Sequence, residues 1–204
     1  MGNVYNFSAD RLFVALERGE PAPGMLLVSA PDIQNEDYTR SVILVVEHNE
    51  AITLGVNLTR RSEIAVFNVL PDWISAVAKP QALYIGGPMN QQAVVGLGMA
   101  RQGVDIAATP FLKRLAPRLV HINLQAQPEE VAEAVDGMRL FAGYCEWAPG
   151  QLDEEIEAGD WYVVPALPGD VIMPGRADLW SDVMRRQPMP LPLFSTYPAH
   201  VEDN

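Results

Sequence analysis

Runs of aliphatic residues, separated by short polar or glycine-containing stretches, dominate the middle of this chain and are typical of strands. The clearest run is 41–48, which reads Ser-Val-Ile-Leu-Val-Val-Glu-His. Its five consecutive aliphatic residues, four of them β-branched, predict a strand that is buried on both faces. Asn49 and Glu50 then predict a turn, and 52–58 is the expected hairpin partner of the strand.

Similar reasoning places the other elements along the chain. Proline near the start and acidic residues in the first turn favour a helix over 128–138, and Gly159 ends a helix that opens at 149–150 and runs through 157. Further helices are expected over 9–18, over 178–186 and, interrupted by Pro71, over 67–78. Further strands are expected over 25–28, 83–85, 93–99, 119–124, 139–145 and 161–164. Residues 1–187 are read as one domain, and four prolines predict an extended tail over 188–204.

Composition narrows the class of protein. The chain has 204 residues, 49% of them hydrophobic, which fits one domain with a sizeable core. Its net charge is −12, and residues 127–204 carry most of the excess, with four arginines against fifteen acidic residues. An acidic surface repels phosphate backbones and anionic lipids, so neither direct nucleic-acid binding nor membrane binding is expected.

The chain also has the features of a cytoplasmic protein. Cys145 is the only cysteine, so no intrachain disulfide can form. The first residues lack the basic and then apolar order of a signal peptide, and no apolar run approaches the ~20 residues of a membrane span.

No strong catalytic or cofactor motif is present. The three histidines lack metal-ligand spacing, and Gly96-Leu-Gly98 lacks the third glycine of a dinucleotide fingerprint, so we expect neither a metal nor a cofactor. Cys145 is either a buried, inert thiol or, if a distant histidine lies beside it, a nucleophile.

The candidate site residues lie at the ends of the predicted strands. Arg40 offers a fork of donors for a carboxylate or a phosphate, whereas Glu47 and His48 lie together beside a turn and can accept or transfer a proton. Arg40 and His48 flank opposite ends of one strand, so they need not share a cleft. The same positions fit polar strand ends with no ligand.

Three further positions complete the candidate set. Asn57 supplies both a donor and an acceptor, and Gly86 and Gly87 either expose backbone N–H groups to an anion or make a tight turn under a packed neighbour. His48, Asn57 and Gly87 are the residues most expected to share a cleft. The candidate ligand-binding set is therefore Arg40, Glu47, His48, Asn57, Gly86 and Gly87, with no catalytic or metal-binding residue assigned.

A set of short segments, in order, resembles the YqgE/AlgH family of bacterial proteins. The segments are Gly24–Pro31, Tyr38–His48, Leu54–Asn57, Ile85–Pro88, Arg139–Tyr144, Trp147–Leu152 and Trp161. The sequence departs from the family where Asn57-Leu-Thr-Arg60 replaces Asn-Arg-Pro, and in the acidic loop before Arg40.

The resemblance implies an α+β fold: a single domain with a bifurcated, barrel-like mixed sheet surrounded by helices. It brings no established reaction, although the AlgH name comes from a proposed role in regulating alginate genes. We therefore expect a cytoplasmic, non-catalytic protein that binds a small molecule or a protein partner, with regulation as one use of that binding. The alternative is a small-molecule enzyme that uses Glu47 and His48, with or without Cys145, at a strand-end cleft.

Overall fold

A computed structural model describes residues 19–172 and 178–197, so the helix expected over 9–18 lies outside the described residues. The strands are β1 (Met25–Ser29), β2 (Val42–His48), β3 (Thr53–Asn57), β4 (Arg61–Ala65), β5 (Ala82–Ile85), β6 (Met89–Ala100), β7 (Leu112–Ala116), β8 (Leu119–Ile122), β9 (Val135–Trp147) and β10 (Trp161–Pro165). The helices are α2 (Val66–Val69), α3 (Pro128–Ala134), α4 (Gln151–Ala158), α5 (Leu179–Arg185) and α6 (Leu191–Phe194), with 3-10 helices η1 (Glu36–Tyr38), η2 (Pro71–Trp73) and η3 (Pro168–Asp170).

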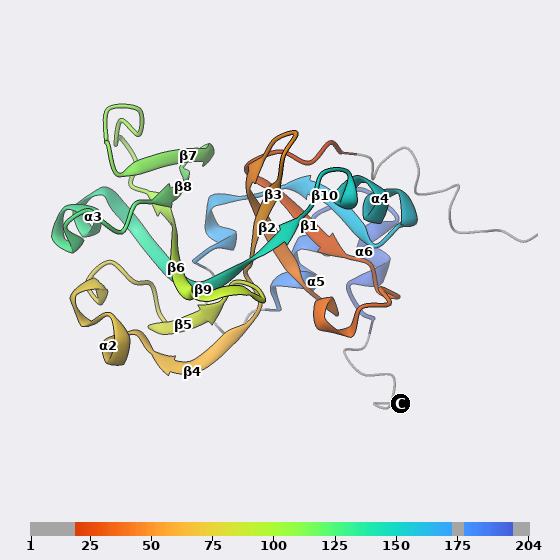
Figure 1. Ribbon diagram of the computed structural model, residues 1–204, viewed down its shortest axis with the longest axis horizontal. Coiled ribbons are helices and arrows are strands. Elements are labelled where there is room, and N and C mark those ends of the chain that lie inside the picture. Colours follow the sequence, from red (N-terminus) through yellow and green to blue (C-terminus); the bar gives the residue numbers. More distant parts are fainter. Residues whose placement is uncertain (1–18, 173–177, 198–204) are drawn as a thin grey trace, which may run out of the picture.

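The strands form one curled sheet in the order β10-β1-β2-β3-β9-β6-β8-β7, with β4 and β5 branching from β9 (Figure 1). Among the described strands, every pair is antiparallel except β5 with β9, so the sheet is mixed. The expected single domain, with a bifurcated and barrel-like sheet accompanied by helices, is therefore confirmed. None of the helices in the described residues is long and apolar enough to cross a membrane.

Strand β2 has the double burial that its aliphatic run predicts. Its first four residues, 42–45, are all fully buried. Leu44 belongs to the core beneath α5 and α6, whereas Ile43 belongs to the core that includes Leu152 of α4. Because successive strand residues point to opposite faces, elements on both sides of β2 keep residues 42–45 from water, while Val46 is partly exposed.

Strand β9 joins the two halves of the sheet. Its C-terminal residues pair with β3, and its N-terminal residues pair with β6 and, in parallel, with β5. The strand changes partners near Gly143, which has a φ of +71°. A Cβ atom there would lie 2.7 Å from the carbonyl oxygens of Gly87 and Met89. Only glycine suits this combination of positive φ and close backbone approach.

Several elements differ from the sequence-based predictions. The helix expected over 128–138 ends at Ala134, because residues from Val135 onward pair with β6 in the long strand β9. The patch at 67–78 contains two short helices, α2 and η2, on either side of Leu70. Strands β4 and β7 were not predicted, because charged residues interrupt their apolar pattern. Of the tail expected to be extended, residues 198–204 lie outside the described residues, and the described part contains α6, whose Leu191 is buried in the core.

A buried ion pair fixes η3 against the end of α5. The guanidinium of Arg186 donates to both carboxylate oxygens of Asp170, with both N–O distances 2.6 Å. Asp170 also accepts a hydrogen bond from the backbone N–H of Leu167, 2.8 Å away. The side chain of Asp170 is only 3% exposed and that of Arg186 is 26% exposed, so the carboxylate depends on the protein for its partners.

Candidate functional site

A pocket of about 370 Å³ lies where the β2–β3 turn meets the start of α4. Its lining residues are His48, Asn49, Glu50, Thr53, Ala148, Pro149, Gly150, Leu152 and Asp153. The volume falls in the range of small-molecule sites, roughly 300–1,000 Å³. Of the six candidate residues from the sequence, His48 alone lines this pocket.

The hairpin holds the His48 side of the pocket in place. His48 pairs with Thr53 across the two strands, and His48 Nδ1 lies 2.7 Å from Thr53 Oγ1. The side chain of Asn49 accepts hydrogen bonds from the N–H groups of Ala51 and Ile52, which fixes the turn, and donates to Glu47 Oε1 at 3.0 Å. Glu47 therefore braces the turn and is not among the lining residues.

The opposite wall is the first turn of α4, which is also firmly anchored. Gly150 caps the helix with a φ of +79°, and the space beside its Cα is open. Further along α4, Glu155 Oε2 accepts hydrogen bonds from the indole N–H groups of Trp147 and Trp161, both at 2.8 Å, and Glu155 Oε1 accepts one from Gln151. These bonds tie the helix to β9 and β10.

The pocket carries groups of different charge. His48 supplies an imidazole, and Glu50 and Asp153 supply carboxylates. Neither carboxylate has a salt-bridge partner within 19–172 or 178–197. The same described ranges contain no group of three or more histidine, cysteine or acidic side chains placed to hold a metal.

Asn57 does not share the cleft with His48. It pairs with Ile43, so it lies at the opposite end of the hairpin from the His48–Thr53 pair. Its exposure is 1%. Its amide donates to Ser41 Oγ at 3.0 Å and accepts from the backbone N–H and hydroxyl of Thr59, at 3.0 and 2.7 Å. The polar groups of Asn57 are thus engaged in the core.

Gly86 and Gly87 pack against β9 and lie near Asn57 rather than His48. The N–H of Gly86 donates to the carbonyl of Ala142, and its carbonyl accepts from the N–H of Asn57, both at 2.8 Å. A Cβ on Gly87 would lie 2.1 Å from the carbonyl carbon of Tyr144. These contacts favour the close-packed interpretation over an anion-binding nest.

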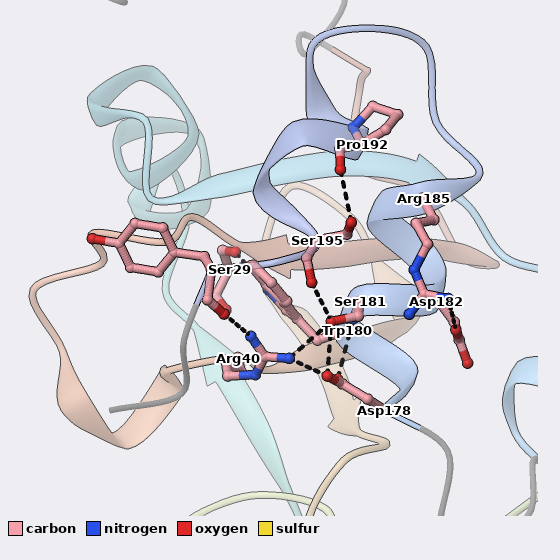
Figure 2. Close-up of polar contacts among 10 residues, drawn as sticks. Ser29, Arg40, Asp178, Trp180, Ser181, Asp182, Arg185, Pro192 and Ser195 are labelled. Atoms are coloured by element: carbon pink, nitrogen blue, oxygen red, sulfur yellow. Dashed lines mark hydrogen bonds and ion pairs between the residues drawn. The ribbon is translucent and has the colours of Figure 1, made fainter. Parts of the chain in front are cut away.

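The guanidinium of Arg40 donates its hydrogen bonds to other groups of the same chain, as Figure 2 shows. Its guanidinium contacts the carboxylate of Asp178, donates to Ser181 Oγ at 2.9 Å and to the carbonyl of Tyr197 at 2.7 Å, and stacks 4.4 Å from the Trp180 ring centroid. Partial burial raises the pKa of Asp178, but the hydrogen bonds from Ser181 and the Arg40 charge outweigh it, so the pKa is lowered overall. Arg40 thus binds a carboxylate, as its chemistry predicts, but that carboxylate belongs to the N-cap residue of α5.

Cys145 lies in an environment that disfavours the thiolate. The side chain is 1% exposed, and its Sγ donates weakly to the carbonyl of Gly86 at 3.5 Å. Burial raises the pKa of this thiol to about 11, against the smaller lowering effects of Tyr38 and Arg60. This environment matches the inert-thiol alternative, since a nucleophilic cysteine requires a lowered pKa.

Reasoning from the sequence missed most of the pocket. Asn49-Glu50 and Pro149-Gly150 were each identified as local breaks between elements, but the two lie about a hundred residues apart in the sequence. Their meeting depends on the pairing of β3 with β9, where Thr53 faces Trp147. In the sequence, Pro149 and Gly150 indicate the start of a helix, and this helix start is the signal that could have directed attention to Gly150 and Asp153.

The different surroundings of Asn57 and His48 give a testable prediction. Asn57→Ala leaves the Thr59 N–H and the Ser41 hydroxyl without their buried partner, so we expect a loss of about 1–3 kcal/mol in the free energy of unfolding. His48→Ala removes one partly exposed hydrogen bond and is expected to cost less than about 1 kcal/mol. Urea titration followed by tryptophan fluorescence measures both, with the exposed Asn68→Ala as control. Equal losses for Asn57→Ala and Asn68→Ala would contradict a structural role for Asn57.

Comparison with known proteins gives one consistent result. The sequence model of the AlgH-like family matches residues 26–192. A UPF0301 protein of Corynebacterium efficiens is 63% identical over 199 residues, covering 98% of this chain and 99% of the relative. A UPF0301 protein of Mycobacterium tuberculosis is 49% identical over 181 residues, covering 89% of this chain and 90% of the relative.

Two solved structures are similar to this one. The crystal structure of a Corynebacterium diphtheriae protein has a TM-score of 0.89 and 66% sequence identity, covering 93% of this chain and 99% of that chain. The solution structure of the AlgH protein from Pseudomonas aeruginosa has a TM-score of 0.64 and 21% identity, covering 91% of this chain and 100% of that one. At this lower identity the AlgH comparison supports the fold alone.

Proposed function

This chain belongs to the AlgH-like family, and we propose from its own geometry that it binds a small polar ligand in the pocket beside His48. The observation that carries this proposal is the pocket itself. Two anchored walls, the β2–β3 turn and the start of α4, enclose about 370 Å³ and present an imidazole, a hydroxyl and two carboxylates. A rigid concave site with a few polar groups is the usual form of a small-molecule site.

The mixture of groups defines the chemistry of the ligand. His48 and Thr53 are already linked by a hydrogen bond, so the imidazole is held in one orientation. Glu50 and Asp153 accept hydrogen bonds only, which favours a ligand that presents N–H or O–H donors. We take binding in the cytoplasm, with regulation as its use, to be the physiological role.

A catalytic role finds less support. The alternative enzyme would use Glu47, His48 and, in one form, Cys145. Glu47 accepts a hydrogen bond from Asn49 and is not among the residues that line the pocket, and the high pKa of Cys145 opposes nucleophilic attack at neutral pH. Binding without chemistry is therefore the better-supported function.

The proposal predicts a ligand-dependent rise in melting temperature. A library of polar metabolites screened by thermal shift should contain at least one that stabilises the parent protein. At a concentration of ~100 Kd the stabilisation is about 2.7 kcal/mol, which corresponds to a rise of about 5–10 °C for a domain of this size. His48→Ala and Asp153→Ala should each abolish most of the shift while leaving the unliganded melt nearly unchanged.

Glu157→Ala is the matched control, because this exposed carboxylate lies on α4 like Asp153 but outside the lining. It should keep the shift. The proposal is wrong if no metabolite stabilises the parent, or if His48→Ala and Asp153→Ala respond to the same metabolite as strongly as Glu157→Ala.

A further inference from the structure

Strand β4 forms an open edge on the side of the molecule away from α4, along the lower rim in Figure 1. It pairs with β5, and no other described strand lies on its outer side. Edge strands expose backbone donors and acceptors that can pair with a strand of another chain. This edge is separate from the pocket beside His48 and has no role in the proposed function.

The hydrogen bonds of β4 show which backbone groups face outward. The N–H of Ile85 donates to the carbonyl of Arg60 at 2.8 Å, and the hydroxyl of Ser62 donates to the carbonyl of Leu83 at 2.7 Å. Because backbone groups alternate between the two sides of a strand, the N–H and C=O groups of Arg61 and Glu63 face away from β5. Beyond Glu63 the register shifts before Ala65, which limits the open stretch to a few residues.

The charges along this stretch are complementary to those of a second, antiparallel copy of the same stretch. In an antiparallel pair of two β4 strands centred on Ser62, Arg61 of one copy lies opposite Glu63 of the other, and the reverse holds across the two-fold axis. Both side chains are exposed, and neither has an ion-pair partner among the described residues. Opposite charges that face each other across strands stabilise the pairing.

Apolar side chains flank the same edge. Ile64 at the end of β4, and Phe67 and Val69 on α2, are 45%, 67% and 48% exposed. Large hydrophobic side chains gathered on one short segment are typical of an interaction surface. In a complex formed at this edge, these side chains would supply apolar contact area, because the strand stretch 61–63 alone is too short to supply it.

We propose that the β4 edge is the interface of a symmetric homodimer, in which Arg61 and Glu63 pair with Glu63 and Arg61 of a second copy and the α2 side chains are covered. The occupant is a second copy because the edge is self-complementary in both backbone direction and charge. The short pairing makes the dimer weak and dependent on ion pairs, so it weakens as salt rises.

Reversing the charges at positions 61 and 63 tests the proposal. Sedimentation velocity from about 5 µM to about 500 µM spans the affinity of weak interfaces and should show the parent protein shifting from monomer to dimer. Arg61→Glu and Glu63→Arg place like charges opposite each other twice, so each should raise the dissociation constant at least about tenfold. The double variant should restore the dimer, and mixing the two single variants should give a heterodimer. Arg114→Glu, on the exposed edge strand β7, is the matched control and should dimerise like the parent.

A monomeric parent at every concentration overturns the proposal, as does a dimer that Arg61→Glu and Glu63→Arg weaken no more than Arg114→Glu does. Failure of the mixed single variants to associate also overturns it. Circular dichroism verifies the fold of each variant. If Arg61→Glu does not fold, Glu63→Arg and Phe67→Ser take its place, and both must weaken the dimer.

Discussion

Leu44→Asp is expected to prevent the domain from folding. Leu44 is fully buried in the core between β1, β3 and α5, and it pairs with Leu26 on one side and Val56 on the other. A carboxylate at this position has no described cationic partner in a core that consists of aliphatic and aromatic residues, and burying an unpaired charge costs several kcal/mol. Since whole domains are stable by only about 5–15 kcal/mol, a loss above about 5 kcal/mol leaves little or no folded protein. Far-UV circular dichroism and a thermal melt measure this directly.

Two controls separate the charge from the loss of volume. Leu44→Ala removes the same packing without a charge and is expected to cost about 2–5 kcal/mol, so it should fold with a lower melting temperature. Leu193→Asp introduces the same charge on α6, where the side chain is 64% exposed, and should change the stability by less than about 1 kcal/mol. A melting temperature for Leu44→Asp within a few degrees of the parent's would contradict the burial of β2 on both faces.

Asp170→Ala is expected to lower the free energy of unfolding by about 3 kcal/mol. The substitution removes both hydrogen bonds to Arg186 and the acceptor for the N–H of Leu167. Arg186 then keeps a charge near the core with no ion-pair partner among the described residues, and its partial exposure to water reduces the cost below that of a fully buried cation. Guanidinium titration of the parent and the variant gives the difference.

The pair Arg185–Asp182 provides the matched control, since it lies on the same helix with side chains 59% and 31% exposed. Asp182→Ala should cost at most about 1 kcal/mol, as is usual for exposed ion pairs. Replacing both members of the buried pair, as in Asp170→Leu with Arg186→Met, should recover part of the loss, because no uncompensated charge remains. Equal effects for Asp170→Ala and Asp182→Ala would contradict the role assigned to burial.

Strands with strong local patterns were predictable from the sequence. The run 42–46 is aliphatic at every position, which is typical of a strand covered on both faces, and its first four residues are buried. Strand β4 was not predictable, because the charged residues Arg61 and Glu63 suit an exposed edge strand but interrupt the apolar pattern that indicates a strand. The helix prediction for 128–138 was wrong beyond Ala134, because pairing with β6 outweighs the local preference of those residues.

Reasoning from residue types identified one residue that lines the pocket, but not which residues lie beside it. The expectation that functional groups gather at strand ends led to His48, which lines the pocket. The same expectation selected Asn57, although it lies at the far end of the hairpin in a buried network. Residue type alone does not reveal which end of an antiparallel pair a side chain occupies, since that depends on the register.

The long strand β9 makes the two halves of the sheet one cooperative unit. Its residues from Cys145 onward pair with β3, whereas residues up to Tyr144 pair with β6 and, at Phe141 and Ala142, with β5. Neither half can therefore lose its structure without removing partners from a strand that the other half needs. A shared central strand of this kind favours a single unfolding transition over separate ones. Substitutions on opposite sides of the molecule, such as those at Leu44 and at the β4 edge, therefore act on the same equilibrium, and their effects on melting can be compared on one scale.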